Sequence, residues 1–244
     1  MSQDQQVIQA LEKLGGVATL GRLYQEVLKD HKWKTKTPQA SIRRIVQVNN
    51  KDFYKIKPGL WALKSRRKEL EARGIIVETE KNRNSKIVQE FTHSYYQGLL
   101  VSIGNLRNLR TFVPNQDKAK MFLNEKLGDL RTLQKQPSYS YEKFVQRSST
   151  IDVIWFNDRE MPEYFFEVEH STDFQNSLNK FSDLQDFYVQ MYIVADKSRH
   201  SEYETKMHYT AYEKIRQRVT FLSYEKLVRQ YELELELQKG NFIR

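Results

Sequence analysis

The sequence predicts an α/β protein of the α+β type, in which a small helical module with a β-hairpin precedes a mixed sheet flanked by helices. Apolar residues recur at helical spacing over the first 48 residues and give way to a hairpin pattern. A second series of helix and strand patterns begins near residue 87, after a charged segment. Between residues 151 and 171, apolar and acidic residues alternate on both sides of a polar turn, which indicates two antiparallel strands.

The N-terminal module consists of helical patterns followed by a hairpin pattern. The first helical pattern stops at the Gly-Gly pair 15–16. Thr19 is expected to cap a second helix, and Thr37, which is followed by proline, opens a third. The segments DFYKI and LWAL, joined by a KPG turn, then predict a β-hairpin. This order is that of a winged helix-turn-helix, and we predict such a DNA-binding domain over residues 1–64.

The third predicted helix carries candidate DNA contacts. At about 100° per residue, Ile42 and Val46 face inward, and basic and amide side chains lie on the opposite side. Side chains expected to reach bases are Arg43, Arg44 and Gln47. Side chains expected to meet phosphates are Lys34, Lys36, Lys55 and Lys57. The segment resembles the small winged-helix (HARE-HTH-like) module at the start of some restriction enzymes and chromatin proteins. A winged helix that contacts proteins is the alternative.

Charge is unevenly distributed along the 244 residues, whose formal net charge is +9. Residues 1–75 hold 16 Lys and Arg against 7 Asp and Glu, and the rest of the chain is balanced at 24 of each. A basic module beside a neutral domain favours DNA as a partner, and a basic surface kept for solubility explains this segregation less well. The absence of cysteine excludes disulfides and thiolate metal sites. A polar start and no membrane-length apolar run favour a cytoplasmic protein without membrane contact.

Residues 65–86 are charged, and we interpret them as a linker in which GIIVE has the composition of a strand. The second domain, expected over residues 87–244, opens with a long helix that ends near Gly104. A short strand and turn at 109–117 precede a helical stretch around 118–130 and a loop. After the hairpin, a helix, a buried strand, a helix, and a strand leading into a helical tail are expected at 172–187, 188–196, 201–218 and 219–227.

The hairpin of residues 151–171 carries the candidate site. Glu167 and Glu169 lie on one face of their strand, because successive side chains of a strand alternate between faces. Pairing across the hairpin would bring Asp152 to this face, and three clustered carboxylates raise one another's pKa unless a cation lies among them. Mg²⁺ prefers oxygen ligands and is the cofactor that we expect. A solvated edge hairpin is the alternative, but apolar residues on the opposite face indicate a packed core.

This order of elements, with Asp152, Glu167 and Glu169, resembles the PD-(D/E)XK nuclease superfamily, the fold of most restriction endonucleases. The resemblance covers about residues 87–230. It implies a restriction-endonuclease-like sheet and a sequence-specific, Mg²⁺-dependent DNA endonuclease, in which Asp152 and Glu167 bind the metal ion. The family usually has Lys where this chain has Glu169, so Glu169 is expected to orient or deprotonate the attacking water, or to bind a second metal ion. Cutting both strands of double-stranded DNA needs two sites, so we expect a homodimer on DNA.

Two other interpretations stay open. A nuclease fold that has lost its activity would act as a DNA-binding regulator, with Glu169 as the sign of that loss. A repair or structure-selective nuclease is disfavoured by the near-neutral second domain. The histidines, at positions 31, 93, 170, 200 and 208, show no paired metal-binding spacing, and the chain has no nucleophile elbow, P-loop or dinucleotide-binding motif. A hydrolase or a DNA binder therefore remains.

Overall fold

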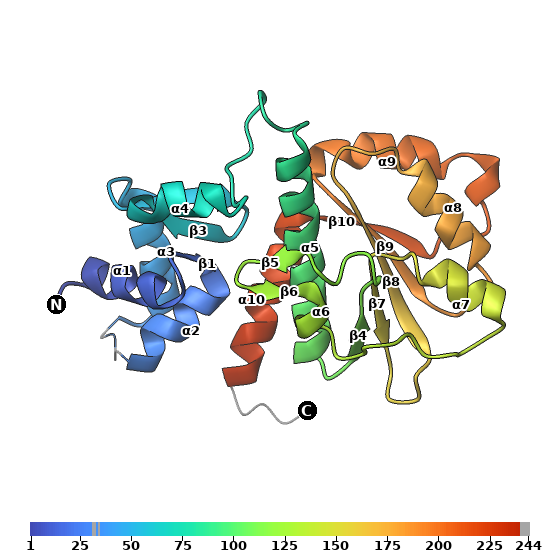
Figure 1. The fold of residues 1–244 in the computed structure, drawn as a ribbon, viewed down its shortest axis with the longest axis horizontal. Coiled ribbons are helices and arrows are strands. Elements are labelled where there is room, and N and C mark those ends of the chain that lie inside the picture. Colours follow the sequence, from blue (N-terminus) through green and yellow to red (C-terminus); the bar gives the residue numbers. More distant parts are fainter. Residues whose placement is uncertain (31–32, 34, 240–244) are drawn as a thin grey trace. The chain divides into compact units, whose positions relative to one another are not determined.

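The computed structural model describes residues 1–30, 33 and 35–239 (Figure 1). It divides into two compact units, of which the first comprises residues 1–91 with the chain from 231 onward and the second comprises residues 92–230. Helices and strands alternate along both units, which confirms the predicted α+β class. Within the described part of the chain, the helices fall short of the length and apolarity that crossing a membrane requires.

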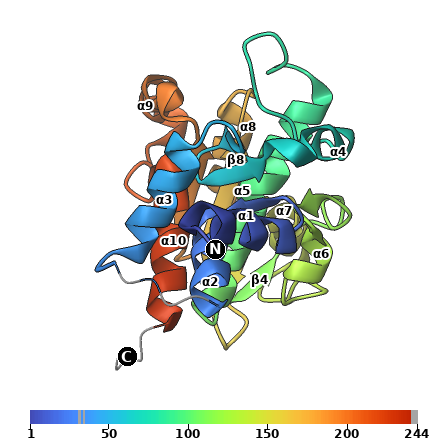
Figure 2. The same ribbon diagram turned by 90° about the vertical axis from the view of Figure 1, so that its left-hand side faces the viewer.

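The first unit follows the predicted order of helices and hairpin. Its elements are α1 (Gln3–Lys13), β1 (Val17–Thr19), α2 (Leu20–Asp30), α3 (Pro38–Val48), β2 (Phe53–Lys57) and β3 (Leu60–Leu63). The strands pair antiparallel in the order β1–β3–β2. Thr19 caps α2 as expected, because its hydroxyl accepts the backbone N–H of Arg22 at 3.3 Å. Helices α1, α2 and α3 (Figure 2) pack around Leu11, Leu23 and Ile42. Their identity as a winged helix stays a prediction.

The segment after the hairpin is more ordered than its charged composition suggests. It contains the short helix α4 (Arg67–Ala72), and GIIVE forms no strand. Leu70 is fully buried and Ile75 is 4% exposed. Burial of these two apolar side chains stabilises the fold of the segment, because it removes their apolar surface from water.

The second unit is built on a mixed sheet with the strand order β10–β9–β8–β7–β4. Strands β8, β9 and β10 run parallel, and β7 is antiparallel to both β8 and β4. Helix α5 covers one face of the sheet, where the indole N–H of Trp155 donates to the carbonyl of Leu100, and α8 packs on the other (Figure 1). These elements are β4 (Arg110–Phe112), β7 (Val153–Phe156), β8 (Pro162–Glu169), β9 (Gln190–Ala195), β10 (Val219–Ser223), α5 (Lys86–Leu106), α8 (Gln175–Asp183), α9 (His200–Met207) and α10 (Tyr224–Lys239).

Three secondary-structure predictions in this unit were wrong. The stretch 118–130 contains β5 (Met121–Phe122), β6 (Glu125–Lys126) and the short α6 (Leu127–Leu130) in place of a helix. The ring of Phe122 packs so closely on α5 that a Cβ on Gly98 would lie 2.1 Å from it, and this contact overrides helix propensity. The predicted loop contains α7 (Glu142–Ser148), where the Ser148 hydroxyl accepts hydrogen bonds from Gln136 and Tyr139. The helix expected over residues 201–218 is also shorter than predicted, because α9 ends at Met207.

Candidate functional site

The predicted carboxylates meet where β7 and β8 pair. Val153 pairs with Phe166, so Asp152, which immediately precedes β7, lies opposite Glu167 at the end of the ladder. The backbone N–H of Val168 donates to Asp152 Oδ2 at 2.7 Å and fixes this carboxylate. Asp152, Glu167 and Glu169 are 9%, 2% and 5% exposed. The charges therefore lie inside the unit and not on a solvated edge.

Helix α8, which follows β8, and the bend before this helix supply the polar partners of the two glutamates. The hydroxyl of Ser177 donates to Glu167 Oε2 at 2.8 Å and also to Glu169, which confirms that both glutamates lie on one face. Thr172 donates to the other oxygen of Glu169. Lys180, one turn after Ser177, has its ammonium 2.8 and 3.0 Å from the two oxygens of Glu167. Ser177 and Lys180 lie three residues apart on one helix face, so both reach the carboxylates.

Lys180 is a site residue that sequence reasoning missed. Its side chain is 11% exposed, and its ammonium also donates to the carbonyl of Thr150 at 2.9 Å. The position two residues after Glu167 is Glu169, where the resembling family usually carries lysine. A positive charge nevertheless reaches Glu167, because the helix returns over the strand that carries it. The signal in the sequence is a lysine on the buried face of the next amphipathic helix.

Burial and neighbouring charges shift the pKa values of Glu167 and Asp152 in opposite directions. Burial raises the pKa of Glu167 to about 8, the charge of Asp152 adds to the rise, and Lys180 opposes it. Burial also acts to raise the pKa of Asp152, but His93 and Lys180 outweigh burial, so this pKa lies below its ordinary value. Burial likewise raises the pKa of Glu169. At neutral pH, without a metal ion, the site combines an ionised Asp152 with a protonated Glu167.

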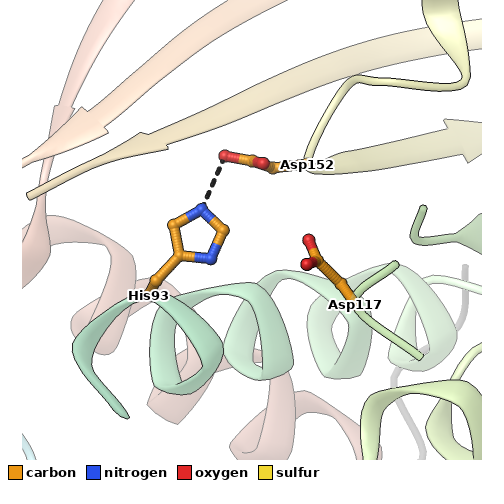
Figure 3. A group of neighbouring side chains, drawn as sticks. All are labelled: His93, Asp117 and Asp152. Carbon is orange, nitrogen blue, oxygen red and sulfur yellow. Dashed lines mark hydrogen bonds and ion pairs between the residues drawn. The ribbon is translucent and has the colours of Figure 1, made fainter. Parts of the chain in front are cut away.

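A second group of side chains meets Asp152 from α5 and from the turn after β4 (Figure 3). The Nε2 atom of His93 lies 3.0 Å from Asp152 Oδ2. Asp117 is 2% exposed; its Oδ2 accepts the amide of Gln97 at 2.8 Å, and its Oδ1 lies 2.6 Å from the ammonium of Lys120. Burial lowers the pKa of His93, but the neighbouring Asp152 raises it by more, so the net shift is upward. Sequence reasoning missed this group because its members lie far apart along the chain.

The candidate DNA contacts of the first unit differ in exposure. Lys36, Arg44, Gln47 and Lys55 are exposed, whereas Lys34 lies outside the described residues. Lys57 is 5% exposed, and its ammonium pairs with Glu78 at 3.1 Å, so it does not present a charge to a phosphate. A register shift between residues 55 and 57 of β2 accounts for this placement, because it changes the face to which the side chain points.

Arg43 is engaged by other side chains of the first unit. Its Nε donates to the hydroxyl of Tyr24 at 3.0 Å, and its guanidinium pairs with Glu232 of α10 at 2.6 Å. Helix α10 runs beside α3 in Figure 2. Glu232 is 4% exposed, so the arginine compensates a buried negative charge. Arg44 and Gln47 remain the exposed candidates on α3 for base contacts.

The fold and the buried charges define an α+β protein with a candidate metal-binding centre. Residues 75–240 match the family described as the C-terminal domain of the type II restriction enzyme NmeDI, and the chain belongs to this family. The type II restriction enzyme NmeDI of Neisseria meningitidis serogroup C is 31% identical over 99 residues, which are 38% of this chain and 28% of that protein. The match thus spans little more than a quarter of the relative. No solved structure matches the chain.

Proposed function

We propose that the chain is a sequence-specific, Mg²⁺-dependent DNA endonuclease of restriction type, with a PD-(D/E)XK active site in its second unit. The observation that carries this proposal is the group of buried carboxylates, Asp152, Glu167 and Glu169, with the ammonium of Lys180 beside them. Membership of the NmeDI C-terminal family supports it. A buried, mutually perturbed set of acids is more typical of a functional site than of a structural one.

The donor set fits Mg²⁺, because Asp152 and Glu167 offer hard oxygen ligands. When bound, the ion would neutralise charge on the phosphate and lower the pKa of a water ligand. Asp152 is ionised and held by the Val168 N–H, so it is ready to bind a cation. Glu169 would orient or deprotonate the attacking water. Lys180 lies beside Glu167, so it would stabilise the negative charge that develops on the phosphate and would serve in place of the lysine absent from position 169.

The first unit would hold the DNA. Its winged helix, proposed for residues 1–64, would present Arg44 and Gln47 to bases and Lys36 and Lys55 to phosphates, since these side chains are exposed. Residues 65–86 would connect it to the nuclease domain at 87–244. Cutting both strands requires two active sites, so a homodimer on DNA belongs to the proposal.

Incubation with plasmid and phage DNAs of differing base modification, with Mg²⁺ or with chelator, tests the activity. We expect discrete Mg²⁺-dependent fragments from the wild type and none from Glu167→Gln or Lys180→Met. Glu213→Gln is the matched control, because Glu213 is exposed and far along the chain from the site. Uncut DNA in every condition, with site-specific binding retained, would refute the nuclease.

That outcome would favour a DNA-binding regulator, for which one observation speaks. Glu167 and Glu169 are satisfied by protein donors, Ser177, Thr172 and Lys180, so the network is also stable as a structural element. Chelation then should leave DNA affinity unchanged, whereas removal of Arg44 should lower it.

A further inference from the structure

A second compact group of side chains contains Asp152, one of the two proposed Mg²⁺ ligands, and two residues outside that pair. His93, Asp117 and Asp152 each offer a ligand atom, and these atoms lie within 4.8 Å of one another (Figure 3). Two donors bound to one ion at about 2.1 Å are at most about 4.2 Å apart. The three ligand atoms therefore lie close to the spacing that one shared ion requires, and small side-chain movements would bring them to it.

Two buried polar atoms beside the group have no hydrogen-bond partner among the described residues: Nδ1 of His93 and Oε1 of Gln97. Gln97 is fully buried, and its amide N–H₂ bridges Asp117 Oδ2 and the backbone carbonyl of Asp152. Buried polar atoms almost always find a partner. A bound ion with its water ligands would supply partners here, and Gln97 already holds both aspartates in place for it.

A cationic side chain, that of Lys120, already contacts the group formed by His93, Asp117 and Asp152. The ammonium of Lys120 lies 2.6 Å from Asp117, whose side chain is only 3% exposed. The lysine side chain is 35% exposed, so it can turn out to water when another cation arrives. The imidazole of His93 contacts the second carboxylate. The pattern is that of anionic ligands compensated by a displaceable cation.

We propose that His93, Asp117 and Asp152 bind a divalent transition-metal ion of the Mn²⁺ type, at a site that shares Asp152 with the proposed Mg²⁺ site. An imidazole and two carboxylates are a mixed nitrogen and oxygen donor set, which suits first-row transition metals, whereas Mg²⁺ favours oxygen alone. This inference rests on the side-chain geometry and does not require nuclease activity.

Mn²⁺ binding to the full chain tests the proposal. Loss of the free Mn²⁺ paramagnetic resonance signal gives the affinity, and pulsed resonance detects a nitrogen nucleus bound to the ion. We expect nitrogen coupling in the wild type, its loss in His93→Gln, and an affinity lower by about 10- to 100-fold or more in that variant. His200→Gln is the matched control, because His200 is exposed and also pairs with a carboxylate, Glu204. It should bind Mn²⁺ like the wild type.

Circular dichroism shows whether His93→Gln folds. If it does not fold, Lys120→Met provides a second test of the proposal. Removing the competing ammonium should raise Mn²⁺ affinity several-fold. Absence of nitrogen coupling in the wild type, its retention in His93→Gln, or unchanged affinity in Lys120→Met would overturn the proposal. DNA cleavage that needs Glu167 but shows no nitrogen coupling would leave the proposed function standing alone. Nitrogen coupling without any cleavage would support this site and refute the nuclease.

Discussion

Replacing Glu167 by glutamine should remove a pH-dependent cost from the folded chain. The pKa of Glu167 is about 8 in the folded state, against an ordinary value of 4.5. Between these values the folded chain keeps the proton and the unfolded chain has lost it. The free energy of unfolding of the wild type therefore falls as the pH rises through this window. Glutamine does not titrate, so the Glu167→Gln variant escapes this fall.

The size of the effect follows from the pKa difference. A difference of about 3.5 between folded and unfolded chain corresponds to about 5 kcal/mol, at about 1.4 kcal/mol for each unit of pKa. Because Glu167 is 2% exposed, solvent does not screen the interaction. The advantage of Glu167→Gln over the wild type should grow between pH 4.5 and pH 8 and then stay level.

Urea unfolding at half-unit steps from about pH 5 to pH 9, in the presence of chelator, measures this difference. Glu213→Gln, at an exposed position, should follow the wild type throughout. The reasoning is refuted if the wild type and Glu167→Gln lose stability in parallel as the pH rises, because Glu167 would then titrate at its ordinary pKa.

Three further predictions concern helices. Gly98→Ala should lower the melting temperature, because the new Cβ would lie 2.1 Å from the ring of Phe122. This clash should outweigh the gain of about 1 kcal/mol in helix propensity. An unchanged melting temperature would contradict this packing. Arg43→Ala should cost about 1 to 3 kcal/mol of stability by leaving Glu232 buried without its arginine, and Arg43→Lys should recover part of it in urea unfolding. Arg44→Ala should weaken DNA binding and relax the base preference at one position of the bound sequence by about 1 to 3 kcal/mol, whereas an unchanged preference among single-base variants in a fluorescence titration would exclude a base contact.

The strand and helix patterns of the second unit could be predicted where burial is periodic. Glu167 and Glu169 alternate with apolar residues in β8, so both their shared face and their burial followed from the sequence. The conformation of the stretch around Phe122 could not be predicted. It depends on packing of the Phe122 ring against Gly98, which lies in a helix distant along the chain and has no side chain to block the ring.

The grouping of side chains in the candidate site was predicted only in part, for a similar reason. Asp152 and the two glutamates lie on one hairpin, so local pairing brings them together. Lys180 and His93 reach the same place from helices on opposite faces of the sheet, and no local pattern fixes that meeting. Lys57 shows the converse, since a one-residue register shift buried a side chain that the hairpin pattern placed in solvent.

The position of Asp152 has a consequence for competition between ligands. Its carboxylate contacts His93 of α5, and its charge acts on Glu167, which is held by α8. One carboxylate therefore interacts with two groups of side chains, which are carried by helices on opposite faces of the sheet. A cation bound beside His93 should draw on the charge that a cation beside Glu167 also needs, so the two ions should bind antagonistically. Each ion should raise the dissociation constant of the other by the same factor. Asp152 would then determine the metal concentration at which binding of one ion gives way to binding of the other.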